Sequence, residues 1–201
     1  MKLNEFPNEE QVPLDFETKK RADFILKRLG LTWEELEGKN VLDVGAGSAE
    51  FGQVAQARGI SVFSFDLHPY WDETLDEAQR RGINTYSPDS TEVVEEILRE
   101  MDIKGGAKPV PYVRGNAYHL PFADESFDYV LAHAGPPVTW SRTKREQEEV
   151  LSEMKRVLQP GGTIRLSPAL SEDALEKKFT ELNKQSDLDP GEIATFYEYQ
   201  K

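Results

Sequence analysis

A hydrophobic run that ends directly in a glycine-rich turn constrains the fold of this chain more than any other segment. Residues 41–44 have the composition of a buried strand, Gly45 and Gly47 follow at once, and an amphipathic segment continues through Arg58. A strand, a tight turn and a helix in this order are typical of the first half of a βαβ unit. Glycine turns of this kind also end strands that bind no ligand, so later segments must decide between a ligand loop and a structural turn.

The turn has the chemistry of a loop that holds a small molecule. Gly45 and Gly47 tolerate positive φ and carry no Cβ, so we expect main-chain amides at the helix N-terminus to approach a polar ligand closely. Asp43 adds a carboxylate two residues before Gly45. That charge would repel a pyrophosphate, whereas a ligand with an ammonium and a sulfonium group would tolerate it. The charge pattern therefore favours S-adenosylmethionine over NAD.

A second predicted strand supports the ligand interpretation. It covers residues 60–66, and Asp66 ends it about twenty residues after the glycines, which is the spacing of the ribose-binding acid in Rossmann-like folds. Asp66 could instead cap the next turn together with Pro69. Further strands are predicted over 112–114 and 126–132. Strands alternating with helical segments predict an α/β fold with a doubly wound, Rossmann-like, mostly parallel sheet.

These segments occur in the order of a known enzyme family. The motifs VLDVGAG at 41–47, GNA at 115–117, LPF at 120–122 and SFD at 126–128 resemble those of class I S-adenosylmethionine-dependent methyltransferases. The similarity is greatest to small-molecule methyltransferases of the type 11-like group, and it runs from residue 39 to about residue 168. The resemblance implies an enzyme that transfers a methyl group from S-adenosylmethionine to an unidentified small-molecule acceptor.

The resemblance also implies roles for individual residues. The loop from Gly45 to Ala49 would hold the methionine part of the cofactor, Asp66 the ribose hydroxyls, and Asn116 with the Ala117 amide the adenine edge. The full set implied to bind cofactor is Asp43, Gly45, Ala46, Gly47, Ala49, Asp66, Leu67, Asn116, Ala117 and His133.

Two of these positions depart from the family pattern. Ala49 replaces a third glycine, and its methyl group narrows the gap between helix and strand or ligand. Asn116 replaces the more usual aspartate, and its carboxamide can accept a hydrogen bond from the adenine amino group without contributing charge. Neither change forbids the cofactor.

The segment after the fourth strand is where we expect the acceptor, because open α/β sheets bind ligands beyond the carboxyl ends of their strands. His133 and Trp140 lie in this segment and are predicted to border the acceptor pocket. His133 either accepts a proton or only lines the pocket. Methyl transfer mainly requires alignment of nucleophile and methyl group, and it needs a base only where the acceptor must lose a proton, so the catalytic residues stay unknown.

We expect a single domain. A helix is predicted from Phe16 to Leu29, and Thr32 with Glu35 has the spacing of a capping box that opens a second short helix. The parts of the domain are leading helices (1–38), the methyltransferase core (39–168) and abbreviated C-terminal elements (169–201).

The C-terminal part resembles the family least. A helix is expected from Ser171 through about Asn183, and a strand over 193–200. The sheet would then be shortened at its C-terminal edge, with fewer than the family's usual seven strands. Its last edge would be open or covered by a second copy in a homodimer. An insertion within 72–110 would be a lid, a substrate wall or a surface decoration.

Composition excludes several other classes. The formal net charge is -13, so the protein would repel a phosphate backbone, and we predict that it does not bind nucleic acid. The absence of cysteine removes disulfides and thiolate ligands, and three histidines without carboxylates at ligand spacing predict no metal. No apolar run approaches the ~18 residues of a membrane span, so we expect a cytoplasmic enzyme without a membrane partner.

Two other functions remain open at this stage. A non-catalytic protein that binds S-adenosylmethionine, or uses the same fold as a scaffold, would suit the abbreviated C-terminus. A nicotinamide-dependent dehydrogenase would share the glycine loop and the acid at the second strand, but it would have to bind NAD.

Overall fold

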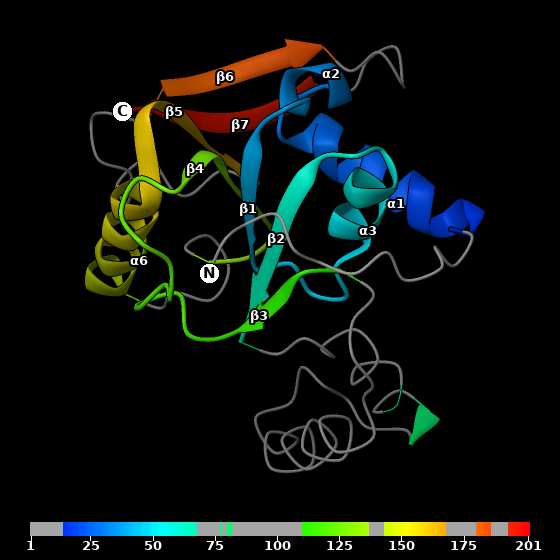
Figure 1. Cartoon of the computed structure of the whole chain (residues 1–201), viewed down its shortest axis with the longest axis horizontal. Helices are drawn as coiled ribbons and strands as arrows, with labels where there is room; N and C mark the ends of the chain where they lie inside the picture. Colours follow the sequence, from blue (N-terminus) through cyan, green and yellow to red (C-terminus); the bar gives the residue numbers. More distant parts are fainter. Residues whose placement is uncertain are drawn as a thin grey trace.

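The computed structural model describes residues 14–67, 77, 80–81, 110–136, 143–167, 180–185 and 193–201. Their strands form one seven-stranded sheet with the order β3-β2-β1-β4-β5-β7-β6 (Figure 1). The strands are β1 (Asn40–Val44), β2 (Ser61–Asp66), β3 (Tyr112–Arg114), β4 (Phe127–His133), β5 (Leu158–Ser167), β6 (Thr180–Gln185) and β7 (Ile193–Gln200). The helices with defined bounds are α1 (Phe16–Arg28), α2 (Trp33–Leu36), α3 (Glu50–Ala57) and α6 (Lys144–Val157).

The sheet is mostly parallel, as the sequence predicts. β1 pairs in parallel with β2 and β4, β2 pairs in parallel with β3, and β4 with β5. Only the pairings of β7 with β5 and β6 are antiparallel. The chain moves outward from β1 to β3 and then returns to place β4 on the other side of β1. That reversal is the switch point of a doubly wound sheet, where ligands bind beyond the carboxyl ends of the strands.

The predicted shortening of the sheet is wrong. β6 and β7 complete seven strands, and β6 occupies residues 180–185, where the helix predicted to run through about Asn183 would end. Local composition favoured a helix there, but pairing with β7 over the whole length of β6 determines the structure. The rest of that predicted helix, from Ser171, lies outside the described residues. The strand predicted over 193–200 is confirmed.

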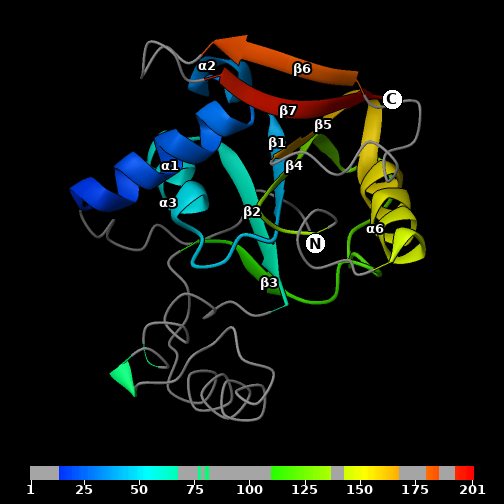
Figure 2. The ribbon, with the colours of Figure 1, turned by 180° about the vertical axis from the view of Figure 1, so that it is seen from behind.

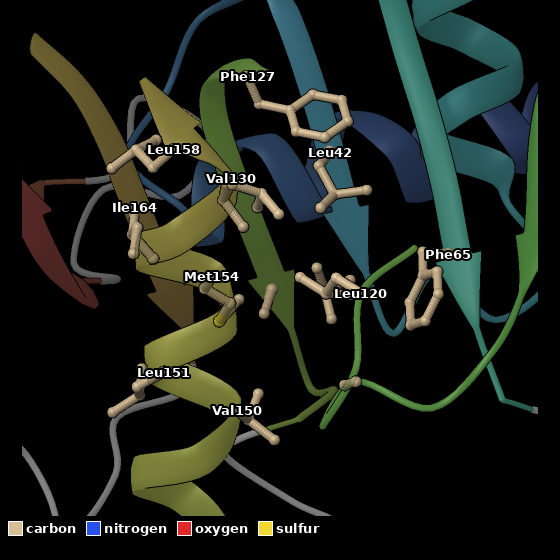
Figure 3. Packing of buried hydrophobic residues seen from close by; sticks show 14 of the residues in the cluster. Leu42, Phe65, Leu120, Phe127, Val130, Val150, Leu151, Met154, Leu158 and Ile164 are labelled. Atoms are coloured by element: carbon tan, nitrogen blue, oxygen red, sulfur yellow. The ribbon is translucent and has the colours of Figure 1, made fainter. Parts of the chain in front are cut away.

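Two hydrophobic clusters cover the two faces of the sheet. Successive residues of a strand point to opposite faces, so Leu42 belongs to one cluster and Val41 to the other. α6 covers the first face, and α1 and α3 cover the second (Figure 2). Figure 3 shows the α6 side, where Met154 points from the helix toward Val130 and Ile164 of the sheet.

The leading helices form as the sequence predicts. Asp15 caps α1 by accepting a hydrogen bond from the Thr18 amide at 2.7 Å. The capping box of α2 is present, since the Thr32 hydroxyl accepts from the Glu35 amide and the Glu35 carboxylate accepts from the Thr32 amide. Trp33 packs in the core, where its ring stacks on Phe51 at 5.4 Å.

The end of α1 docks tightly against β7. Gly30 follows the helix with a φ of +65°, and a Cβ added there would lie 2.0 Å from the ring of Phe196. The Arg165 guanidinium lies 4.5 Å from the centroid of the same ring, and it donates a hydrogen bond to the Leu29 carbonyl. The helix can approach the sheet this closely only because residue 30 has no side chain.

Gly30→Ala should therefore destabilise the protein more than Gly38→Ala. Gly38 has nearly the same φ, +68°, but no atom lies within 4 Å of its added Cβ. Both changes incur the strain of a left-handed alanine, about 1 to 2 kcal/mol, and only Gly30→Ala adds overpacking, about 1 to 3 kcal/mol more. Urea unfolding of the two variants measures the difference, and equal midpoints and slopes would contradict close packing at Gly30.

Candidate functional site

A cavity of about 210 Å³ opens at the carboxyl ends of the strands. It is lined by the loop after β1, the end of β2, the loop after β3, the loop after β4 and one residue of α6. Five of the predicted cofactor residues line it, namely Gly45, Asp66, Leu67, Asn116 and Ala117. The remaining lining residues are Phe65, Gly115, Tyr118, Pro136 and Val150.

The glycine loop has the backbone conformation that the sequence predicts. Gly45 and Gly47 have φ values of +83° and +52°. A Cβ added to Gly45 would lie 2.7 Å from the Gly135 Cα, and one added to Gly135 would lie 2.8 Å from the Val44 carbonyl oxygen. The loops after β1 and β4 are therefore in direct backbone contact at the switch point. Sequence reasoning missed the role of Gly135, because contact between the two loops depends on strand order.

The hydrogen-bond partners of the loop amides differ from the prediction. We expected them to approach a ligand, but the Gly45 and Ala46 amides donate to the Phe65 carbonyl oxygen at 2.8 and 3.2 Å. The Gly47 amide donates to Asp66 Oδ2 at 2.9 Å. These three donors thus fasten the loop to the end of β2. A phosphate-binding loop, by contrast, directs such amides at the ligand.

Ala49 has a left-handed backbone conformation that the sequence did not predict. It is the N-cap of α3 with φ +64° and ψ +29°, a left-handed conformation that glycine adopts more easily. Its side chain is fully buried, and its amide donates to the Ala46 carbonyl at 2.8 Å. The loop therefore keeps the geometry of a glycine turn at this position with a methyl group in place.

Asp43 is a buried acid directly below the loop. It is 5% exposed, and burial, together with the negative charges of Asp66 and Glu50, raises its pKa to about 7. A carboxylate in this position is more stable when a cation lies nearby. The electrostatics of the loop therefore favour a positively charged ligand group.

The raised pKa of Asp43 gives a pH-dependent stability. Between the ordinary value of 3.8 and about 7, the folded protein holds a proton that the unfolded chain has released, so raising the pH through this window weakens folding. Asp43→Asn cannot ionise. We expect the free energy of unfolding of the variant to increase relative to that of the wild type as the pH rises from 4 to 7. The difference should reach about 2 to 4 kcal/mol at pH 8. Urea unfolding at several pH values measures this, and a pH-independent difference would contradict the assignment.

The loop after β3 forms the other end of the cavity. Asn116 Oδ1 accepts a hydrogen bond from the Tyr118 amide at 3.0 Å, which fixes the orientation of the carboxamide. Ala117 is buried next to it. From α6, Glu153 accepts from the Leu120 amide at 2.9 Å, and Arg156 donates to the Leu120 carbonyl at 2.8 Å. Arg156 in turn keeps the pKa of Glu153 below its usual value.

The hydrogen bonds of Glu153 and Arg156 to the turn after β3 were not predicted from the sequence. Both side chains belong to α6. Arg156 also donates to the Phe122 carbonyl at 2.8 Å, so two side chains of α6 hold the whole turn that carries Asn116. No local signal marks such residues, because their partners lie more than thirty positions earlier in the chain.

His133 lies at the same edge of the sheet but does not line the cavity. Its ring packs edge-on against Phe24 of α1, with centroids 5.8 Å apart. Burial, together with the positive charges of Arg28 and Arg21, lowers its pKa to about 4. Within the described part of the chain, no group forms a hydrogen bond with its Nδ1. Trp140, the other residue predicted at the acceptor pocket, lies outside the described residues.

Among the described residues, no three histidine or acidic side chains group closely enough to hold a metal ion. None of the helices in the same residues is both long and apolar enough to cross a membrane.

Comparison with known proteins identifies the family. Residues 42–166 match the methyltransferase domain family. The chain belongs to this family. The match covers the glycine loop, Asp66 and the turn that carries Asn116, which are the segments that form the cavity. S-adenosylmethionine is the cofactor of these methyltransferases.

Curated relatives of the methyltransferase domain include quinone-modifying enzymes. The demethylmenaquinone methyltransferase of Listeria welshimeri is 32% identical over 128 residues, which are 64% of this chain and 44% of the relative. The ubiquinone/menaquinone biosynthesis C-methyltransferase of Haemophilus ducreyi is 29% identical over 128 residues, which are 64% of this chain and 40% of that protein. The aligned part thus spans less than half the length of these relatives.

Solved structures support the same fold. The PH0226 protein from Pyrococcus horikoshii superposes with a TM-score of 0.54 at 17% identity, covering 92% of each chain. At this identity the likeness concerns the fold alone. It agrees with the complete seven-stranded sheet of the methyltransferase domain.

The residues present fit S-adenosylmethionine better than a dinucleotide. The amides at positions 45–47 are bonded within the protein, so they are not donors for a pyrophosphate. Asp43 and Asp66 lie near the loop, and their negative charges suit a cationic methionine group. The methyltransferase domain thus has the electrostatics that its family cofactor requires.

Proposed function

We propose that this chain transfers a methyl group from S-adenosylmethionine to a small-molecule acceptor. The observation that carries the proposal is the direction of the loop amides, which fasten the loop to β2 and leave carboxylates as the nearest charges. That arrangement attracts a sulfonium and an ammonium group and repels phosphate. It argues against the nicotinamide-dependent alternative.

Each end of the cavity suits one part of the cofactor. The loop residues Gly45, Ala46, Gly47 and Ala49 would surround the methionine part, with Asp43 as the opposing charge. Asp66 would accept hydrogen bonds from the ribose hydroxyls, because a carboxylate has lone pairs left after binding the Gly47 amide.

The adenine base of the cofactor would lie in the part of the cavity formed by the loop after β3. Leu67, Asn116 and Ala117 line the cavity. The Asn116 carboxamide uses Oδ1 for the Tyr118 amide, so it offers the base a remaining lone pair on Oδ1 and the two N–H groups of Nδ2. An aspartate at this position would offer acceptors only. The substitution at 116 thus changes the hydrogen-bonding character of this part of the cavity as well as its charge.

When bound, the cofactor supplies an electrophilic methyl group on sulfur. The chain's own contribution is to align the acceptor with that methyl group and to exclude water. A histidine with a pKa of about 4 is a weak base at neutral pH, so we propose that His133 borders the acceptor side without taking a proton. Trp140 is proposed for the same pocket from its place in the sequence.

A quinone-like ring is the acceptor class that we propose. Its support is the function of the relatives, which are a demethylmenaquinone methyltransferase and a C-methyltransferase of ubiquinone and menaquinone biosynthesis. Apolar residues line part of the cavity, among them Phe65, Pro136 and Val150, and they are consistent with such a ligand.

The scaffold alternative has lost the feature that favoured it. An abbreviated C-terminus would have suited a non-catalytic protein, but β6 and β7 complete the sheet. Incubation with methyl-labelled S-adenosylmethionine and a panel of acceptors, including short-chain quinols, separates the two functions. Labelled product supports the enzyme. Cofactor binding without product from any acceptor would favour the scaffold.

Asp66→Ala should weaken cofactor binding strongly. Loss of hydrogen bonds to a charged group costs about 1.5 to 3 kcal/mol, so we expect the Kd for S-adenosylhomocysteine to rise about 10- to 150-fold. Asp15→Ala is the matched control, because it removes the α1 cap without touching the cavity. Calorimetric titration of both variants measures the effect. Equal affinity in Asp66→Ala and wild type would remove Asp66 from the site.

A further inference from the structure

A tyrosine on the edge strand β3 forms a second side-chain hydrogen bond with the backbone of Gly47. The Tyr112 hydroxyl donates a hydrogen bond to the Gly47 carbonyl oxygen at 2.9 Å, across 65 positions of sequence. The Gly47 amide donates to Asp66 Oδ2 at the same distance. Both backbone polar groups of Gly47 are thus bound by side chains of neighbouring strands, β3 and β2.

The register of the sheet explains how Tyr112 reaches the loop. Tyr112 pairs with Ser64 of β2, so the two side chains point to the same face. That face is the one covered by α3, because a Cβ added to Gly52 would lie 2.4 Å from the Ser64 hydroxyl. The glycine loop opens α3, and a side chain as long as tyrosine spans the distance from β3 to it.

The bond has a consequence for the ligand because Gly47 is conformationally free. A glycine populates positive and negative φ about equally, so its φ of +52° must be held by contacts. If the Gly47 carbonyl were released, the amide on the other side could turn away from Asp66. The Asp66 carboxylate would then lose the hydrogen bond from the Gly47 amide.

We infer that Tyr112 is a positioning residue for cofactor binding. Its hydroxyl fixes Gly47, and through Gly47 it fixes the carboxylate that holds the ribose. The inference rests on the proposed function, since it concerns the same cavity. None of the motifs that define the family resemblance includes this tyrosine, and it acts without lining the cavity itself.

Tyr112→Phe tests the inference by removing one hydroxyl and keeping the ring. A neutral hydrogen bond contributes about 0.5 to 1.5 kcal/mol, so we expect the Kd for S-adenosylhomocysteine to rise about 2- to 12-fold. KM for the cofactor should rise in parallel, with kcat changed less. Tyr129→Phe is the matched control, because Tyr129 lies on β4 and packs in the cluster under α1 and α3. The control should leave the Kd within twofold of wild type.

A double-variant cycle separates positioning from a general loss of stability. Asp66→Ala removes the acceptor of the Gly47 amide, and its expected loss leaves binding measurable. If Tyr112 acts through Gly47 and Asp66, the double variant should bind no more than twofold more weakly than Asp66→Ala alone. Thermal melts confirm that each variant is folded at the titration temperature.

Three outcomes would overturn the inference. An unchanged Kd in Tyr112→Phe would overturn the inference and leave the proposed function standing. Fully additive losses in the double variant would do the same, because they would indicate a structural effect independent of Asp66. Failure of the wild type to bind S-adenosylhomocysteine overturns the proposed function, and the inference falls with it.

Discussion

The carbonyl group of Phe65 holds the site together, because two amides of the glycine loop donate to it. Phe65 is the penultimate residue of β2, and its neighbour Asp66 accepts the third loop amide. The loop after β1 is therefore tied to the end of the adjacent strand. The position of α3, the direction of the loop carbonyls and the place of both carboxylates follow from this attachment.

A second constraint fixes the opposite wall of the cavity. The loop after β4 touches the loop after β1 at Gly135 and Gly45, where no side chain would fit. Glu153 and Arg156 of α6 hold the turn after β3. Because α6 also carries the core residues Leu151 and Met154, the part of the cavity formed by the turn after β3 is attached to a helix that packs in the core. A rigid frame of this kind suits a reaction that depends on alignment.

The sequence predicted the elements well where local chemistry determines them. The positive φ of Gly45 and Gly47, the capping box at Thr32 and the parallel order of strands follow from short-range signals. It failed at β6, because a strand that forms by antiparallel pairing with β7 has no such signal of its own. In the site, residue types were predicted and their partners were not. The use of the loop amides depends on the Phe65 carbonyl, and Arg156 reaches a turn more than thirty positions away.

Burial of Asp43 couples the cofactor to protons. With a pKa of about 7, the carboxyl is partly protonated at neutral pH, and a cationic ligand beside it would favour the ionised form. Association of such a ligand would therefore expel a fraction of a proton into the solvent. The heat of association would then vary with the ionisation enthalpy of the buffer, and cofactor occupancy would fall as the surroundings acidify. The fraction of the protein with bound cofactor would therefore depend on the pH.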